Sequence, residues 1–246
     1  MSSDHSTSQK SAPAPLNPDL PPAWRGTRAA GGLAIGPVSQ FEVGEQKNFV
    51  YIVHDWQTRE AALVDPQADI NTPIRWLLEQ GLKLTRVLIT HSHYDHIAGL
   101  EQLCSRFPGL PIHVDSQEKL RIKVPQWVWE PVFDGHPIAV GNLLINPIHT
   151  PGHSSGEICY HLPTPAPGYL LSGDTVFIRD CGRTDLPTGS NSAMFESLQK
   201  LKKLPPKTIL LPGHHYASEV ASTLEREWST SPPFLAKTVQ ELAALE

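Results

Sequence analysis

The chain has 246 residues, a formal net charge of -5 at pH 7 and three cysteines. This length is sufficient for one large domain or two small ones, each with a sizeable hydrophobic core. The negative charge, without any run of lysine or arginine, argues against binding to nucleic acid or to an anionic membrane surface. No apolar segment approaches the roughly 18 to 20 residues that a membrane helix needs, which argues against a membrane protein.

The N-terminal segment is rich in Ser and Pro and lacks the apolar core of a signal peptide. Its first 24 residues contain Asp4 and Asp19 but no Arg, whereas a mitochondrial presequence is Arg-rich and poor in acids. We interpret residues 1–25 as a disordered tail and 26–246 as a single domain. An odd number of widely spaced cysteines favours reduced thiols over a disulfide framework, so we predict a cytoplasmic protein.

Alternating apolar residues near the start of this domain predict a hairpin, with strands over 48–54 and 60–65. A helix is predicted next, over 71–81, with Thr72 as its cap and Gly81 as its end. Further strands are predicted at 84–90, 111–115, 137–149, 157–162, 168–174 and 208–213. Further helices are predicted at 96–109, 192–204, 218–229 and 232–246. Strands, a helix, more strands and another helix suggest packed sheets with helices outside, and not a regular doubly wound repeat.

The segment THSHYDH (90–96) places three histidines and an aspartate directly after the apolar run LTRVLI. Desolvating imidazoles and a carboxylate costs free energy unless each finds a partner, and a metal ion would be such a partner. His or Asp also follows three other strand-like runs, in the turns HTPGH, SGD and PGHH. Because site residues usually lie in loops at strand ends, we interpret these side chains as one site. The candidate ligands are His91, His93, Asp95, His96, His153, Asp174 and His214.

Imidazole and carboxylate donors suit Zn, Fe or Mn, and the absence of cysteine from these motifs argues against a structural thiolate zinc site. Seven candidates exceed what one tetrahedral ion takes. We therefore predict two divalent metal ions, with Zn favoured over Fe or Mn, roughly 3.5 to 4 Å apart. Asp174 is the predicted bridge between them, because it comes from its own strand end. His149 is left open, and the histidines interpreted as ordinary surface or hydrogen-bonded residues are His5, His54, His113, His136 and His161.

THSHYDH, HTPGH, LLSGD and LLPGHH, in this order, resemble the four metal-ligand motifs of the metallo-β-lactamase-fold superfamily and together span residues 90–216. The resemblance implies an α+β fold, a four-layer αββα sandwich. It also implies which residues bind each metal. The first metal would be held by His91, His93 and His153, the second by Asp95, His96 and His214, with Asp174 bridging.

A metal-bound water, whose pKa falls to about 7, is a nucleophile at neutral pH. In a hydrolase of this family a bridging hydroxide would attack an acyl carbon while one metal stabilises the oxyanion. Asp95 would orient the hydroxide or accept its proton. A thiolate leaves without help from a general acid, and the motifs contain no obvious one. We therefore predict a glyoxalase II-like (hydroxyacylglutathione hydrolase-like) enzyme that cleaves a small glutathione-derived thioester.

The segment FIRDCGRTDLPTG (177–189) resembles the loop after the bridging aspartate in glyoxalase II and, more closely, in persulfide dioxygenases. That resemblance implies that Arg183 binds glutathione, since a guanidinium pairs with a carboxylate through two hydrogen bonds. An ordinary salt bridge with Asp180 or Asp185 is the alternative. Tyr216 matches the tyrosine that follows the last ligand in the dioxygenases, and it is the second predicted substrate residue.

The alternative function is a mononuclear non-haem iron persulfide dioxygenase acting on glutathione persulfide. One Fe(II) would then be bound through His91, His153 and Asp174. The short segment after the HHY motif favours this alternative, whereas His215 stands where the dioxygenases have Asp. The segment 125–138 is also longer than theirs, and we interpret its aromatic residues as core in preference to a pocket wall. A sensor using Cys181 is a third alternative, and the assembly is left open, with a homodimer as one option.

Overall fold

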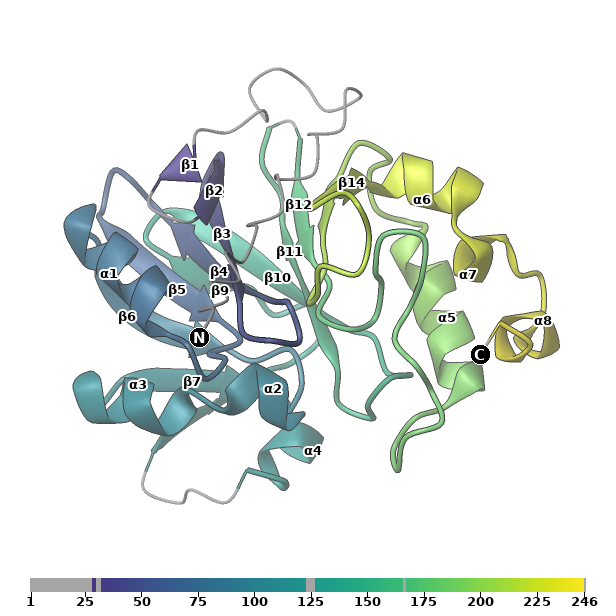
Figure 1. Ribbon diagram of the computed structural model, residues 1–246, viewed down its shortest axis with the longest axis horizontal. Helices are drawn as coiled ribbons and strands as arrows, with labels where there is room; N and C mark the ends of the chain where they lie inside the picture. The colour runs from purple at the N-terminus through teal and green to yellow at the C-terminus, as the bar shows by residue number, and fades with distance from the viewer. Residues whose placement is uncertain (1–27, 30–31, 123–126, 166, 246) are drawn as a thin grey trace, which may run out of the picture.

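The computed structural model describes residues 28–29, 32–122, 127–165 and 167–245, so the predicted tail at 1–25 lies outside the described residues. Two sheets pack face to face, with helices on both outer sides (Figure 1). The predicted four-layer αββα architecture is therefore confirmed.

The first sheet has eight strands in chain order. They are β1 (Arg28–Ala29), β2 (Gly32–Ile35), β3 (Val38–Val43), β4 (Asn48–His54), β5 (Glu60–Val64), β6 (Lys83–Leu88), β7 (Pro111–Val114) and β8 (Val128–Pro131). The strands β1 to β5 are antiparallel neighbours, whereas β5 to β8 run parallel. The parallel strands need crossover connections, and these carry α1 (Asn71–Glu79), α2 (Tyr94–Ile97), α3 (Leu100–Arg106) and α4 (Ser116–Lys119).

The second sheet has the order β14-β13-β12-β11-β10-β9. Its strands are β9 (Ile138–Val140), β10 (Leu143–His149), β11 (Ile158–Leu162), β12 (Tyr169–Leu171), β13 (Ile209–Leu211) and β14 (Ser222–Thr223). Only β12 and β13 pair in parallel, and α5 (Asn191–Leu201) crosses between them. The C-terminal helices α6 (Leu224–Thr230), α7 (Pro232–Leu235) and α8 (Val239–Ala243) lie beside α5 on the outer side (Figure 1).

The core has three apolar layers because the central strands are buried on both faces. In β4, Tyr51 and Val53 point between the two sheets, whereas Val50 and Ile52 point toward α1 and α3. The strands of the second sheet alternate in the same way, with Leu170 facing α5. A strand that is covered on both faces has no polar side, and this explains the continuous apolar runs in the sequence.

Several predicted boundaries were wrong. The N-cap of α1 is Ile70, and no side chain caps the helix, so Thr72 does not have the predicted role. The predicted helix over 96–109 is two helices, because Gly99 contacts the β5–α1 connection. A Cβ at Gly99 would lie 2.2 Å from the Gln67 carbonyl oxygen, and its amide donates to the Pro66 carbonyl. The predicted strand 137–149 is a hairpin that turns at Gly141, whose φ is +57°.

The C-terminal predictions also need correction. The helix predicted over 218–229 begins only at Leu224, and the one predicted over 232–246 is the pair α7 and α8. The strands β1, β2, β3, β8 and β14 were not predicted.

The aromatic stretch at 125–138 is partly core, as predicted. Trp127 and Trp129 pack against the apolar layer under α3, and Val132 is buried between the sheets. Phe133, by contrast, is 58% exposed. Residues 125 and 126 lie outside the described part of the chain.

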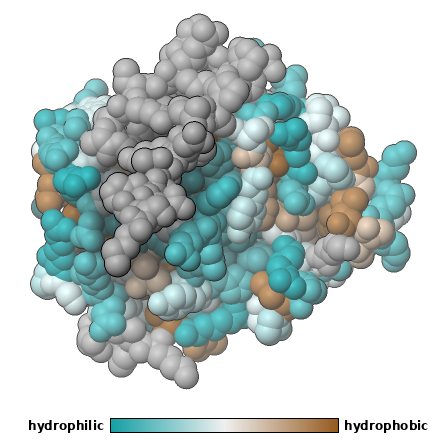
Figure 2. Space-filling view, in the orientation of Figure 1, coloured by the Kyte–Doolittle hydropathy of each residue, from teal (hydrophilic) through white to brown (hydrophobic). Residues whose placement is uncertain are grey.

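None of the helices in the described segments combines the length and apolar composition needed to cross a bilayer. The face shown in Figure 2 is largely hydrophilic, with apolar residues scattered among polar ones.

Candidate metal centre

All seven predicted ligands lie just beyond the ends of strands, where the two sheets meet. His91 and His93 follow β6, and Asp95 and His96 lie in the short α2. The other three ligands follow strands of the second sheet. These are His153 after β10, Asp174 after β12 and His214 after β13.

Three overlapping groups of these side chains have donor atoms within 4.8 Å of one another. The groups are His91, His93 and His153; His91, His96 and Asp174; and Asp95, His96 and His214. Because His91 and His96 each belong to two groups, the seven side chains form one continuous centre.

Asp174 reaches both halves of this centre. Its Oδ2 atom lies 3.5 Å from His153 Nε2 and 3.4 Å from His214 Nε2. Its Oδ1 atom lies 3.4 Å from His96 Nε2. A carboxylate in this position is suited to bridge two cations.

Some of the ligand nitrogens lie so close together that a bound cation explains their arrangement better than hydrogen bonds between them. His93 Nδ1 lies 2.8 Å from His153 Nε2, and His96 Nε2 lies 3.2 Å from His214 Nε2. Imidazole nitrogens face each other this closely only if a proton or a cation shares their lone pairs. His91 Nε2 is buried and has no hydrogen-bond partner in the described residues, which is costly unless another ligand satisfies it.

Burial and the neighbouring charges shift the pKa values of the histidines in this centre in opposite directions. Burial lowers the pKa of His91 and of His93 below the ordinary value, so that both favour the neutral, ligating form. Burial alone would also lower the pKa of His96, but Asp174 and Asp65 raise it well above its ordinary value. The pKa of Asp174 is held well below its usual range, because the neighbouring histidines, His96 above all, outweigh its burial. Burial lowers and the neighbouring carboxylates raise the pKa of His214, with a net rise to about 9. The centre thus combines ionised carboxylates with imidazoles, and it becomes the donor set that Zn, Fe and Mn accept once a metal displaces the protons of His96 and His214.

Groups outside the ligand set hold the rings in place. Asp65, at the end of β5, accepts hydrogen bonds from the Thr90 amide (2.8 Å) and from His96 Nδ1 (3.0 Å). His153 Nδ1 donates to the Arg183 carbonyl at 2.8 Å, and His214 Nδ1 donates to the Gln46 carbonyl at 3.0 Å. In His96, His153 and His214 the Nδ1 proton is used in a hydrogen bond, which leaves the Nε2 lone pair for a metal.

Two further polar residues, which sequence analysis missed, support the carboxylates. Asn48 Nδ2 donates to Asp95 Oδ2 at 2.9 Å, and Glu157 accepts from the Asp174 amide at 2.7 Å. Both are fully buried or nearly so. The only sequence signal was their position next to apolar strand residues, where a polar side chain requires a partner.

Tyr216 lies directly against the centre. Its ring stacks on His214 with centroids 4.6 Å apart and an interplanar angle of 12°, and it is 61% exposed. Burial and the charges of Asp174 and Asp95 raise the pKa of Tyr216 to about 12, so its hydroxyl stays protonated at neutral pH.

Arg183 forms a two-bond ion pair with Asp185. Its Nε and one terminal nitrogen each lie 2.6 Å from a carboxylate oxygen of Asp185. The loop salt bridge considered in the sequence analysis therefore exists, with Asp185 as the partner. The role of Arg183 in substrate binding stays a prediction.

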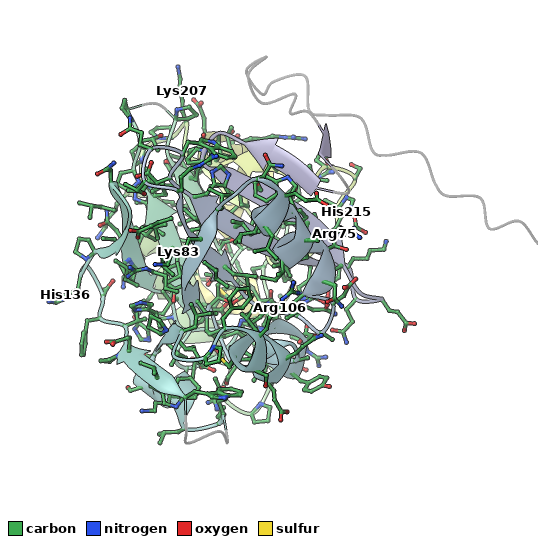
Figure 3. The ribbon with its side chains drawn as sticks, turned by 90° about the vertical axis from the view of Figure 1, so that its left-hand side faces the viewer. Arg75, Lys83, Arg106, His136, Lys207 and His215 are labelled. Carbon is green, nitrogen blue, oxygen red and sulfur yellow. The ribbon has the colours of Figure 1, made fainter. Side chains whose placement is uncertain are left out.

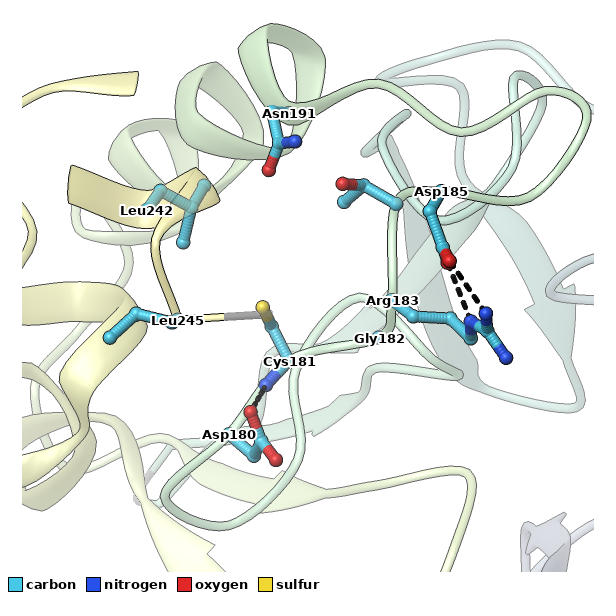
Figure 4. A pocket seen from close by; sticks show the side chains of 9 residues that line it. Asp180, Cys181, Gly182, Arg183, Asp185, Asn191, Leu242 and Leu245 are labelled. Atoms are coloured by element: carbon cyan, nitrogen blue, oxygen red, sulfur yellow. Dashed lines mark hydrogen bonds and ion pairs between the residues drawn. The ribbon is translucent and has the colours of Figure 1, made fainter. Parts of the chain in front are cut away.

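The loop that carries Arg183 separates the metal centre from a cavity of about 290 Å³. A Cβ at Gly182 would lie 2.9 Å from the His153 ring, so the loop backbone passes directly against a ligand. The cavity is lined by Asp180, Cys181, Gly182, Arg183, Thr184, Asp185, Asn191, Leu242 and Leu245. Figure 4 shows the Cys181 sulfur pointing into it and the side chains of Arg183 and Asp185 paired at its edge.

The other histidines do not join the centre. Among the described residues, none of His54, His113, His136, His149 and His161 belongs to a group of side chains that could hold a metal. His149 Nε2, left open above, lies 3.1 Å from the Ser155 carbonyl oxygen. Figure 3 shows His136 at the edge of the molecule. His5 lies outside the described residues.

Comparison with known proteins agrees with this geometry. The family model described as "Metallo-beta-lactamase superfamily" matches residues 43–214. A relative named hydroxyacylglutathione hydrolase, from Trichormus variabilis, is 34% identical over 172 residues, which are 69% of this chain and 65% of the relative. The chain thus matches slightly less than two thirds of that relative's length.

Two solved structures are similar along most of the chain. ETHE1 from Myxococcus xanthus superposes with a TM-score of 0.74 and 28% identity, covering 84% of this chain and 88% of that one. TTHA1623 in a di-iron-bound form has a TM-score of 0.67 and 27% identity, covering 78% and 98%. The fold, the family match and the convergence of the four motifs lead to one conclusion: the chain belongs to the metallo-β-lactamase superfamily.

Proposed function

We propose that the protein is a metal-dependent hydrolase that cleaves a glutathione-type thioester. The observation that carries the proposal is the position of Asp174, whose carboxylate lies within 3.5 Å of histidines from both halves of the centre. Relatives named hydroxyacylglutathione hydrolase, at about one third identity, support the same reaction class.

We propose that the centre binds two divalent metal ions, with Zn favoured and Fe or Mn as alternatives. The first would be bound by His91, His93 and His153, the second by Asp95, His96 and His214, with Asp174 shared. When bound, the ions would supply a hydroxide at neutral pH and polarise the acyl carbonyl.

The protein groups then have separate roles. Asp95 has a pKa lowered below its ordinary value, chiefly because the hydrogen bond from His214 outweighs its burial, so it stays ionised and can orient the nucleophile or accept its proton. The phenol of Tyr216, held on the His214 ring, would contact the substrate. Arg183 would bind a glutathione carboxylate in exchange for Asp185. A thiolate leaving group needs no general acid, so this set is sufficient for thioester cleavage.

A persulfide dioxygenase with one Fe(II) is the second candidate. Two observations favour it: the CGRTD element at 181–185 and the similarity to ETHE1, which extends over 88% of that chain. His91, His153 and Asp174 would then bind the iron.

Elemental analysis of protein from minimal medium, combined with assays on S-lactoylglutathione and glutathione persulfide, separates the two. We expect two metals per chain and thioester cleavage. One iron per chain with oxygen uptake on the persulfide would contradict the hydrolase.

We also propose a cytoplasmic location. The support is that Cys104 and Cys159 are free thiols in the fold, as expected in a reducing compartment. Fractionation of the native host checks this.

A further inference from the structure

One fully buried carboxylate outside the ligand set joins the two loops of the proposed first metal site. Glu118 lies on α4 and has no exposed surface. Its Oε2 atom accepts from the Ser92 amide at 2.9 Å and from the Ser92 hydroxyl. Its Oε1 atom accepts from the Gly156 amide at 3.0 Å.

These contacts lie next to the ligands along the chain. Ser92 stands between His91 and His93, and Gly156 follows His153 by three residues. The two loops come from different sheets, β6 belonging to the first and β10 to the second. Glu118 therefore connects, through one side chain, the two segments that must approach each other for the first group of ligands to form.

The second loop packs tightly against Glu118, and Arg121 compensates the negative charge of the carboxylate. A Cβ at Gly156 would lie 2.9 Å from Glu118 Cγ, so only glycine allows the second loop to approach this closely. Arg121 Nη1 lies 3.2 Å from both carboxylate oxygens, and its Nη2 donates to Ser155 Oγ at 3.1 Å. The donors thus come from both loops and from a guanidinium, and only an ionised carboxylate offers two acceptor oxygens to all of them.

We propose that Glu118 is a positioning residue that sets the distance of His91 and His93 from His153 and thereby the affinity of the first metal site. This inference rests on the proposed two-metal centre. The second group of ligands is held by other residues: Asp65 binds His96, Asn48 binds Asp95 and the Gln46 carbonyl binds His214. None of these is a hydrogen-bond partner of Glu118, so its loss should weaken one metal site selectively.

The test is the Glu118→Gln variant, which keeps the shape of the side chain but replaces one acceptor oxygen with an NH2 donor. That donor must face either the Ser92 amide or the Gly156 amide, and the lost hydrogen bond releases one of the loops. In zinc titrations with a competing chelator, we expect the Kd of one metal to rise about 10- to 100-fold, the range known for outer-sphere partners of ligands. The Kd of the other should change by less than about threefold.

Two further variants keep the test decisive. Ser92→Ala retains the carboxylate and removes one hydroxyl donor, so it should weaken the same metal by a smaller factor even if Glu118→Gln does not fold. Glu101→Gln, on the exposed side of α3, is the matched control and should bind both metals like the wild type.

The outcomes separate this inference from the proposed function. A wild-type protein that binds no zinc would refute the two-metal centre itself. A wild type with two zinc sites and a folded Glu118→Gln variant that binds both equally well would overturn the role of Glu118. Equal weakening of both sites, with a lower unfolding temperature, would also overturn it, because Glu118 would then only stabilise the fold.

Discussion

Asp65 Oδ2 accepts a hydrogen bond from His96 Nδ1 at 3.0 Å, although the two residues are 31 positions apart in the sequence. Both side chains are buried, and Asp65 adopts a φ of +53° that few residues other than glycine tolerate. The backbone at the end of β5 thus takes a strained conformation at the point where its carboxylate meets a candidate ligand. This pair orients the imidazole that is shared by two of the three ligand groups.

Replacing Asp65 with Asn should therefore weaken metal binding without removing a ligand. An amide can present either an acceptor or a donor to His96 Nδ1, but it no longer compensates the charge on the ring. We expect the affinity of the second metal to fall by about 10- to 100-fold. The measurement is zinc competition with a chelator. Asp69→Asn, at an exposed position on the same connection, is the control, and unchanged affinity in Asp65→Asn would contradict the role of this pair.

Asp174→Ala tests the centre as a whole. Since its carboxylate lies near histidines of both halves, its loss should reduce the binding of both metals. We expect thioester hydrolysis to fall more than about a thousandfold, because several kcal/mol of transition-state stabilisation by the metals would be lost. Metal content and kcat/KM are measured together. A variant that loses its metals yet still hydrolyses the thioester would refute the metal-dependent mechanism.

A pH dependence of stability follows from a histidine far from the ligand groups. Burial lowers the pKa of His54 from 6.5 to about 4, so the folded protein binds this proton less well than the unfolded chain does. The stabilisation from neutral His54 is therefore complete above pH 6.5 and is lost as the pH falls toward 4. In His54→Gln, the loss of unfolding free energy between pH 7 and pH 5 should be smaller by on the order of 1 kcal/mol.

The measurement is urea unfolding of metal-free wild-type protein and variant at pH 7 and pH 5. Removing the metals beforehand excludes their acid release from the comparison. His136→Gln, at an exposed residue, serves as the control. An equal pH dependence in wild type and His54→Gln would show that the ring is not held neutral.

The sequence predicted those site residues whose role is indicated by their immediate neighbours in the chain. Each ligand follows an apolar strand run within a few residues, so the strand and the turn together identified all seven side chains that the structure brings to one centre. The supporting residues had no such signal. Glu118 lies in the polar segment DSQEK, which is typical of an exposed helix, and it is buried only because loops from two sheets fold over it.

The same reason explains the misplaced helix boundaries. Periodicity alone favours one helix over 96–109, but Gly99 contacts the chain near Gln67, a contact that only the folded structure brings about. Thr72 has the right chemistry for a cap, yet α1 already begins at Asn71. Side-chain chemistry predicts what a residue can do, whereas distant contacts decide which backbone group it meets.

The pairing of Arg183 with Asp185 gives a prediction about substrate binding. Both side chains are more than half exposed, so the ion pair is screened and contributes little to stability. A glutathione carboxylate can therefore replace Asp185 at low cost. If Arg183 binds the substrate, Arg183→Ala should raise KM about tenfold with little change in kcat, because a contact made equally in ground and transition states affects binding alone. Asp185→Asn, which removes the competing carboxylate, should lower KM. Steady-state kinetics on S-lactoylglutathione measure both effects, and an Arg183→Ala variant with unchanged KM would assign the arginine to the loop salt bridge instead.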